Sequence, residues 1–257
     1  MEDAHLATKL NILGKEFKIF GIFDGHGGAN ASIFVKSNLT KYLSHYLKEE
    51  FVNTKNLDIA IYNAFKSAFY RLDYDYKDFD GTTATVAVIV DNTVYTANAG
   101  DSRTLIIDGQ NILQLSEDAK PDISKFSKRI HKRGGYITPD QITNHYGQKI
   151  HEIPRVNGCL AVASSIGDKK IKGFGNLCCV PARPKITKYQ PKQKNFQLVL
   201  ACDGLFDVAT TNTVGQNIQD LFKRNQSVEN IAEKIVNAAY TAGSSDNIST
   251  MVVKNYS

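Results

Sequence analysis

Long apolar runs are missing from this 257-residue sequence. The longest, Ala84 to Val90, has the length of a strand, whereas a membrane-spanning helix needs about 20 apolar residues. The first residues, MEDAHLATKL, carry acids and have no apolar centre, unlike a secretory signal peptide. We therefore expect no membrane span and a cytoplasmic location, with the nucleus as the other compartment that these features allow.

Cysteine is also scarce. There are four cysteines, and no two of them are spaced as C-x-x-C, which argues against a zinc site. The neighbours Cys178 and Cys179 are poorly placed to bridge each other. We expect reduced thiols, as is usual for intracellular proteins.

The sequence contains no internal repeat, no low-complexity tract and no linker rich in proline, glycine and serine. Its 42% hydrophobic and 22% charged residues are typical of a globular protein. Residues 1–257 are therefore predicted to form one domain, which we expect to be monomeric. The net charge of +5 is mild, and basic residues are scattered apart from the run Lys125 to Arg133, so nucleic-acid binding is not expected.

Two kinds of apolar periodicity alternate along the chain. Alternation and short apolar runs predict strands, and i, i+3, i+4 spacing predicts helices. The predicted strands lie at 17–23, 83–90, 93–99, 103–108, 111–115, 197–202 and 247–253. The predicted helices lie at 31–47, 57–72, 122–133, 213–224 and 228–240, the last with Ser227 as its N-cap. Residues 137–195 are turn-rich and are predicted to be surface loops.

The strands come mostly in hairpins and the helices mostly in pairs. This order favours an α+β fold with antiparallel sheets covered by helix pairs. A parallel βαβ fold fits less well, because no crossover helix is predicted between residues 82 and 115.

Acids stand where apolar strands end. Asp24 follows FKIFGIF, Asp203 follows QLVLAC, Asp101 follows YTANAG, and Asp246 precedes NISTMVV. A buried acid is costly unless its charge is compensated, and Mg²⁺ or Mn²⁺ would do so through oxygen ligands. The alternative is that each Asp caps a turn through its own backbone. Periodicity alone does not bring these acids together in space.

Nine segments carry a resemblance to a known family. They are MEDAH (1–5), FDGHGG (23–28), GTTATVAVI (81–89), NAGDSR (98–103), SEDAKPD (116–122), GGYIT (134–138), RVNGCLAVASSIGD (155–168), LACDGLFDV (200–208) and SDNIST (245–250). In this order they resemble the signature motifs of the protein phosphatase 2C family. The resemblance spans nearly the whole chain.

The resemblance implies a central antiparallel β-sandwich flanked by pairs of helices, with a two-metal site at one end. It implies that the carboxylates of Glu2, Asp24, Asp203 and Asp246 and the carbonyl of Gly25 bind two Mg²⁺ or Mn²⁺ ions, with Asp24 bridging both. Asp118 and Asp207 match positions that hold a third, weaker metal. His26 matches the general acid, and Asp3 resembles the residue that orients metal-bound water.

These residue types suit phosphate ester hydrolysis. Two cations lower the pKa of a bridging water, and the hydroxide attacks phosphorus in line. The implied substrates are proteins phosphorylated on serine and threonine. No covalent intermediate is needed, so Cys202 is predicted to be a core residue.

Three positions depart from the family pattern. No arginine precedes Glu2 in this sequence, Ala119 replaces a histidine, and Ser164 stands where an arginine is usual. We expect the two missing arginines to weaken phosphate binding more than they weaken the metal site. The complete carboxylate set favours an enzyme over the alternative, a pseudophosphatase that serves as a protein-binding module. A nuclease or other metal hydrolase is disfavoured, because no basic groove pattern is evident.

Overall fold

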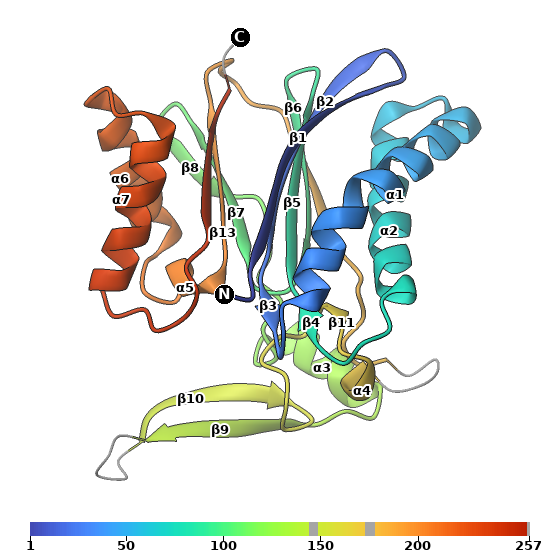
Figure 1. The fold of residues 1–257 in the computed structure, drawn as a ribbon, viewed down its shortest axis with the longest axis vertical. Coiled ribbons are helices and arrows are strands. Elements are labelled where there is room, and N and C mark those ends of the chain that lie inside the picture. Colours follow the sequence, from blue (N-terminus) through green and yellow to red (C-terminus); the bar gives the residue numbers. More distant parts are fainter. Residues whose placement is uncertain (144–148, 173–177, 256–257) are drawn as a thin grey trace.

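Two antiparallel sheets pack face to face in the computed structural model, which describes residues 1–143, 149–172 and 178–255 (Figure 1). The first sheet has the strand order β1-β2-β5-β6-β12 and the second β14-β13-β7-β8. Their bounds are Ala4–Ile12 (β1), Lys15–Phe23 (β2), Ala84–Val90 (β5), Thr93–Ala99 (β6), Lys185–Tyr189 (β12), Thr250–Lys254 (β14), Gln197–Ala201 (β13), Arg103–Asp108 (β7) and Asn111–Gln114 (β8).

A pair of helices covers the outer face of each sheet (Figure 1). The five-stranded sheet carries α1 (Asn30–Thr54) and α2 (Leu57–Asp75). The four-stranded sheet carries α6 (Thr211–Lys223) and α7 (Val228–Thr241). The predicted α+β sandwich is therefore confirmed. No helix in the described ranges is long and apolar enough to cross a membrane.

Three apolar clusters hold these layers together. One lies between the sheets and includes Ile22, Ile106 and Leu200. The other two lie under the helix pairs. β5 and β6 are buried along their whole length, because they have apolar layers on both faces.

Local turn chemistry agrees with the predicted hairpin between β5 and β6. Asp91 and Asn92 have φ angles of 48° and 58°. Two consecutive left-handed residues form the type I′ turn that matches strand twist, and Asp and Asn tolerate this conformation well. The N-cap prediction for α7 is also confirmed, because the Ser227 side chain accepts a hydrogen bond from the Asn230 N–H.

The prediction that residues 137–195 form only loops is wrong. This region contains the hairpin β9 (Ile137–Thr143) and β10 (Lys149–Val156), the short elements β11 (Ile166–Gly167) and α4 (Lys169–Lys172), and the edge strand β12. β9 and β10 carry Pro139 and Pro154 and lack apolar alternation, which is the usual sequence signal of a strand. β1 was also not predicted, although its residues alternate between a more buried and an exposed face and Leu6, Leu10 and Ile12 share the more buried one.

A smaller unit closes one end of the sandwich (Figure 1). It comprises the β9–β10 hairpin, α3 (Ser124–Lys132) and a three-stranded sheet in the order β11-β4-β3, where β3 is Gly25–His26 and β4 is Gly81–Thr82. The N-terminus and α5 (Asp203–Phe206) lie at the same end. Segments far apart in the sequence therefore meet here.

Asp80 ties the first residues of α1 to this end. Its Oδ2 accepts hydrogen bonds from the backbone N–H groups of Asn30 (3.0 Å) and Ala31 (3.2 Å), and the Tyr76 hydroxyl donates to its Oδ1. Asp80 is 8% exposed. It thus supplies the cap that Ala29, at the N-cap position, cannot provide.

We expect Asp80→Ala to lower the free energy of unfolding by about 1–3 kcal/mol, because two helix N–H groups and one buried hydroxyl lose their acceptor. Urea unfolding followed by circular dichroism measures the change. Exposed Asp78 is the matched control, and Asp78→Ala should shift stability by less than about 0.5 kcal/mol. Equal effects of the two changes would contradict this role.

Candidate metal centre

Asp24 and Asp203 meet at one end of the sandwich. Asp24 follows the last residue of β2, and Asp203 follows β13 after one intervening residue, Cys202. One carboxylate oxygen from each aspartate and the Cys202 Sγ lie within 4.8 Å of one another. The two strands belong to facing sheets, so their ends bring together acids that are 179 positions apart in sequence.

These two carboxylates repel each other. Burial, followed by the charge of Asp203, raises the pKa of Asp24 far above its usual range. Burial, followed by the charges of Asp207 and Asp246, raises the pKa of Asp203 to about 6. Adjacent carboxylates cannot both ionise readily unless a cation compensates them.

Asp3 and Asp246 add to the same negative region. Both carboxylate oxygens of Asp3 are buried and make no hydrogen bond of ordinary geometry within the described residues, although Ser249 and Asp24 lie close. Burial raises the pKa of Asp3, and the charge of Asp246 raises it further. Asp246 itself is exposed. Buried carboxylate oxygens without donors indicate that a further partner belongs here.

Glu2 and Gly25 are packed against each other at this end. A Cβ added at Gly25 would collide with the Glu2 carbonyl oxygen, so only glycine fits. The Ser32 hydroxyl donates to that carbonyl (2.5 Å), and the Glu2 N–H donates to Asn247 Oδ1 (2.8 Å). The backbone that carries Glu2 is thereby held beside β3 and beside the segment of Asp246.

Asp101 lies next to this cluster, although it was not among the predicted metal ligands. It is 4% exposed. Burial, followed by the charge of Asp203, raises its pKa to about 7, while Lys120 opposes the shift. The signal that could have found it is the one that pointed to Asp24 and Asp203, an acid directly after a buried strand.

Lys120 lies between two acids on the outer side. Its Nζ is 3.0 Å from Asp207 Oδ1 and 3.7 Å from Asp101 Oδ2. A cationic group thus already bridges these two carboxylates. Asp207 is well exposed, and its side chain keeps 57% of its surface accessible.

Asp118 is held differently. Arg103 binds both of its carboxylate oxygens, through Nε (3.2 Å) and Nη2 (2.5 Å). The same guanidinium donates to Thr211 and stacks 4.3 Å over the Phe206 ring. A paired bidentate carboxylate has its charge neutralised by arginine, so Asp118 is less available to a cation than Asp101 is.

Cys202 lies beside the acids but is a core residue, as predicted, because it is fully buried. Its Sγ donates to the Asn247 carbonyl and accepts from the Ser249 N–H, both at 3.1 Å. Burial keeps the pKa of its thiol far above the ordinary value. A neutral thiol is a poor ligand for the hard cations that prefer oxygen.

Two of the departures from the family pattern are buried in the smaller unit. Ala119 packs in the apolar cluster with Ile130 and Val162. Ser164 is 3% exposed, and its hydroxyl donates to the Pro181 carbonyl (2.7 Å). Neither position presents a cationic side chain to the acids.

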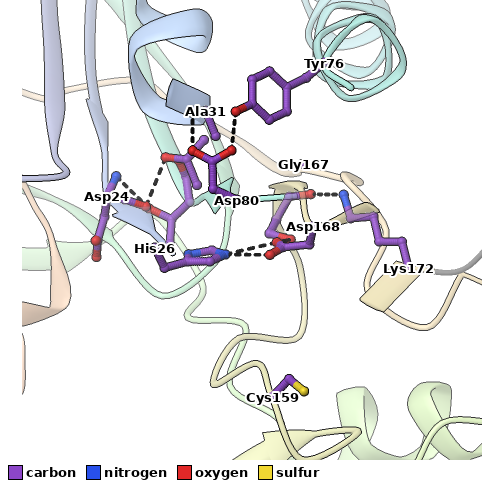
Figure 2. A network of polar contacts seen from close by, with 12 residues as sticks. Asp24, His26, Ala31, Tyr76, Asp80, Cys159, Gly167, Asp168 and Lys172 are labelled. Carbon is purple, nitrogen blue, oxygen red and sulfur yellow. Dashed lines mark hydrogen bonds and ion pairs between the residues drawn. The ribbon is translucent and has the colours of Figure 1, made fainter. Parts of the chain in front are cut away.

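His26 points away from Asp24 and toward Asp168 (Figure 2). Its Nε2 is 3.0 Å from both Oδ1 and Oδ2 of Asp168. Burial opposes protonation of the ring, but the hydrogen bond and charge of Asp168 outweigh it and raise the pKa of His26. Asp168 was not singled out from the sequence, because a glycine-aspartate pair in a turn-rich region has no distinguishing periodicity.

The donor set fits a hard divalent cation. The atoms that converge are carboxylate oxygens of Asp24 and Asp203 beside the Cys202 Sγ, and both oxygens of Asp3 lack a hydrogen-bond partner within the described residues. Mg²⁺ and Mn²⁺ take such ligands. Bound cations would also relieve the repulsion between Asp24 and Asp203.

Comparison with known proteins agrees with this geometry. The family model "Protein phosphatase 2C" matches residues 1–248. "Probable protein phosphatase 2C 52" of Oryza sativa subsp. japonica is 34% identical over 99% of this chain, and "Probable protein phosphatase 2C 59" of Arabidopsis thaliana is 33% identical over 100%. This chain spans 48% of the length of the rice relative and 76% of the Arabidopsis one.

A solved structure shares the fold. The "serine-threonine phosphatase 2C from Toxoplasma gondii" superimposes with a TM-score of 0.79 at 22% identity, over 99% of this chain and 90% of that one. The resemblance seen in the nine sequence segments is confirmed by the family model and by the relatives. This chain belongs to the protein phosphatase 2C family.

Proposed function

We propose that residues 1–257 act as one catalytic domain that hydrolyses phosphoserine and phosphothreonine in proteins, with two Mg²⁺ or Mn²⁺ ions. The observation that carries this proposal is the contact between Asp24 and Asp203, whose carboxylates are both buried enough to have raised pKa values. A pair of acids without a bound cation does not stabilise an apolar core. A phosphatase of this family, in contrast, needs such a pair to bind its cations.

The position of each residue at this end of the sandwich suggests its role. Asp24, Asp203, Glu2 and Asp246 would hold the cations with their carboxylates, and Gly25 with its carbonyl. The bound cations supply a nucleophile at neutral pH and offset the phosphoryl charge. Asp3 is suited to accept a hydrogen bond from the attacking water, because within the described residues its buried oxygens accept no hydrogen bond of ordinary geometry.

A third, weaker cation is best supported beside Asp207 and Asp101. Lys120 already occupies the space between these carboxylates at 3.0 and 3.7 Å, so a cation there would compete with an ammonium group. Asp118, which the resemblance suggested for this role, is neutralised by Arg103. We expect it to affect such a cation indirectly, through Arg103 and the local field.

Metal-dependent hydrolysis of p-nitrophenyl phosphate tests the proposal. Turnover should require Mn²⁺ or Mg²⁺, should discriminate little between them because all proposed donors are oxygen, and should stop in excess chelator. Isothermal titration should show two or more bound Mn²⁺ ions. Full activity in chelator would exclude the two-metal proposal.

The second candidate is a non-catalytic, protein-binding member of the family. Ala119 and Ser164 favour it, because these buried residues replace the histidine and the arginine that are usual at the two positions in the family. The same assay separates the candidates. A protein that binds Mn²⁺ with the expected stoichiometry and yet turns over neither aryl phosphate nor a phosphopeptide would support the binding module.

A further inference from the structure

We propose that Asp168 is a positioning residue that fixes the ring orientation and the tautomer of His26 for protonation of the leaving oxygen. This inference rests on the proposed phosphatase function, in which His26 is the general acid. The two residues are 142 positions apart in sequence. β3, which ends at His26, and β11, which directly precedes Asp168, lie on either side of β4. This arrangement brings the side chains of His26 and Asp168 together (Figure 2).

The contact between His26 and Asp168 involves both carboxylate oxygens and is largely buried. Both oxygens of Asp168 lie 3.0 Å from the same nitrogen, His26 Nε2. The Asp168 side chain is 3% exposed, whereas the His26 side chain keeps 30% of its surface accessible. The carboxylate is therefore fixed inside the protein, and the imidazole connects it to solvent.

Asp168 is itself held in place by several groups. The Ser165 hydroxyl donates to its Oδ2 (2.5 Å), and its own N–H donates to the Asp80 carbonyl (3.0 Å). Its φ is +56°, a left-handed conformation that aspartate adopts more readily than most residues other than glycine.

Gly81 leaves the space that this contact needs. A Cβ added there would collide with both Asp168 Oδ2 and His26 Nε2. The residue between the two partners must therefore have no side chain, and a substitution can push them apart without altering either one.

Lys172, whose charge also acts on His26, is held by groups other than Asp168. Lys172 is 6% exposed, and its Nζ donates to Asp73 Oδ1 (2.6 Å) and to the Ser165 carbonyl (2.7 Å). Asp73 Oδ1 also accepts from the Gly167 N–H (2.9 Å). Lys172 thus anchors the segment on α2 and leaves the charge of Asp168 directed at the imidazole.

This arrangement sets how the ring would handle the proton. Nε2–H stays hydrogen-bonded to Asp168, so Nδ1 is the nitrogen left to exchange a proton with substrate. As hydroxide attacks phosphorus, the P–O bond to the leaving group breaks, its electron pair stays on oxygen, and the Nδ1 proton moves to that oxygen. The proton lost when water supplied the hydroxide restores the ring. A carboxylate that fixes an imidazole tautomer is a general device for such transfers.

The test compares two esters with Asp168→Asn. Phenyl phosphate has a basic leaving group that needs a proton, whereas p-nitrophenolate leaves readily without one. We expect kcat for phenyl phosphate to fall about 100-fold and kcat for p-nitrophenyl phosphate to fall by less than about fivefold. Gly81→Ala should produce the same selective loss, and His26→Gln combined with Asp168→Asn should be no worse than His26→Gln alone.

Asp73→Asn is the control, because Asp73 belongs to the same network without contacting His26. The Asp73→Asn change should lower the melting temperature and reduce kcat for the two esters by a similar factor. Nitrogen NMR of His26, recorded at a pH where the ring is neutral, adds a readout that needs no turnover, since the neutral ring should show one tautomer, protonated at Nε2, in the parent and a mixture in Asp168→Asn. If Asp168→Asn lowers kcat equally for both esters and leaves the His26 tautomer unchanged, the proposal for Asp168 is overturned. Absence of metal-dependent turnover in the parent would instead overturn the proposed function, and the NMR result would still decide whether Asp168 sets the tautomer.

Discussion

Asp203→Asn is expected to abolish metal binding and turnover together. Asparagine keeps the shape of the side chain and removes the charge that, with Asp24, would anchor the cations. The loss should be large, because Asp203 is only partly exposed and faces Asp24 directly. Mn²⁺ stoichiometry, melting temperature and turnover of the variant measure the effect. If Asp203→Asn retains two bound metals and normal turnover, the proposed active site is wrong.

Asp118→Asn is the matched comparison. The Asp118 carboxylate is paired with Arg103, so the two core metals should stay bound in this variant. Turnover should fall only about 10–100-fold, the usual size of indirect effects at metal sites. The alternative, in which both aspartates merely cap turns, predicts about 1 kcal/mol of lost stability for each and little change in turnover. Similar collapse of metal binding in both variants would contradict the division into inner and outer acids.

A second large effect concerns the metal-free protein, which should lose stability as pH rises from about 5 to 8. The pKa of Asp203 is raised to about 6 and that of Asp101 to about 7, against about 4 in the unfolded chain. In this window the folded state holds more protons than the unfolded one, so the free energy of unfolding falls with pH. Each pKa unit corresponds to about 1.4 kcal/mol, and the combined loss should reach a few kcal/mol.

Divalent cations should reverse this trend. The proposed ligands are deprotonated carboxylates, so metal affinity should rise with pH, and saturating Mn²⁺ should flatten or invert the slope of melting temperature against pH. Thermal unfolding from pH 5 to 8, with chelator and with Mn²⁺, measures both arms. His26 contributes in the same direction, because its pKa is raised as well, so His26→Gln serves as the control that isolates the acids. A melting temperature in chelator that is constant or rises across this range would refute the prediction.

Local patterns in the sequence predicted much of this protein. Apolar runs and i, i+4 spacing identified β2, β5, β6, β7, β13 and the helices α1, α2, α3, α6 and α7, because each depends on periodicities of the chain itself. The two-residue gap between the predicted strands 83–90 and 93–99 indicated a hairpin, and Asp91 and Asn92 have the left-handed backbone that its turn needs. The acids after strands were visible for the same reason, and the nine motifs identified the family.

Other features depended on the tertiary structure. β9 and β10 have no apolar alternation, since their hairpin pairs away from the main core. Which acids share a site was also undetermined, because Asp101 and Asp118 stand in equally suggestive positions until Arg103 is seen to bind one and Lys120 to approach the other. The contact between His26 and Asp168 arises only when β3 and β11 pair with β4. Distance and burial determine charge compensation, and neither is a property of residues taken in order along the chain.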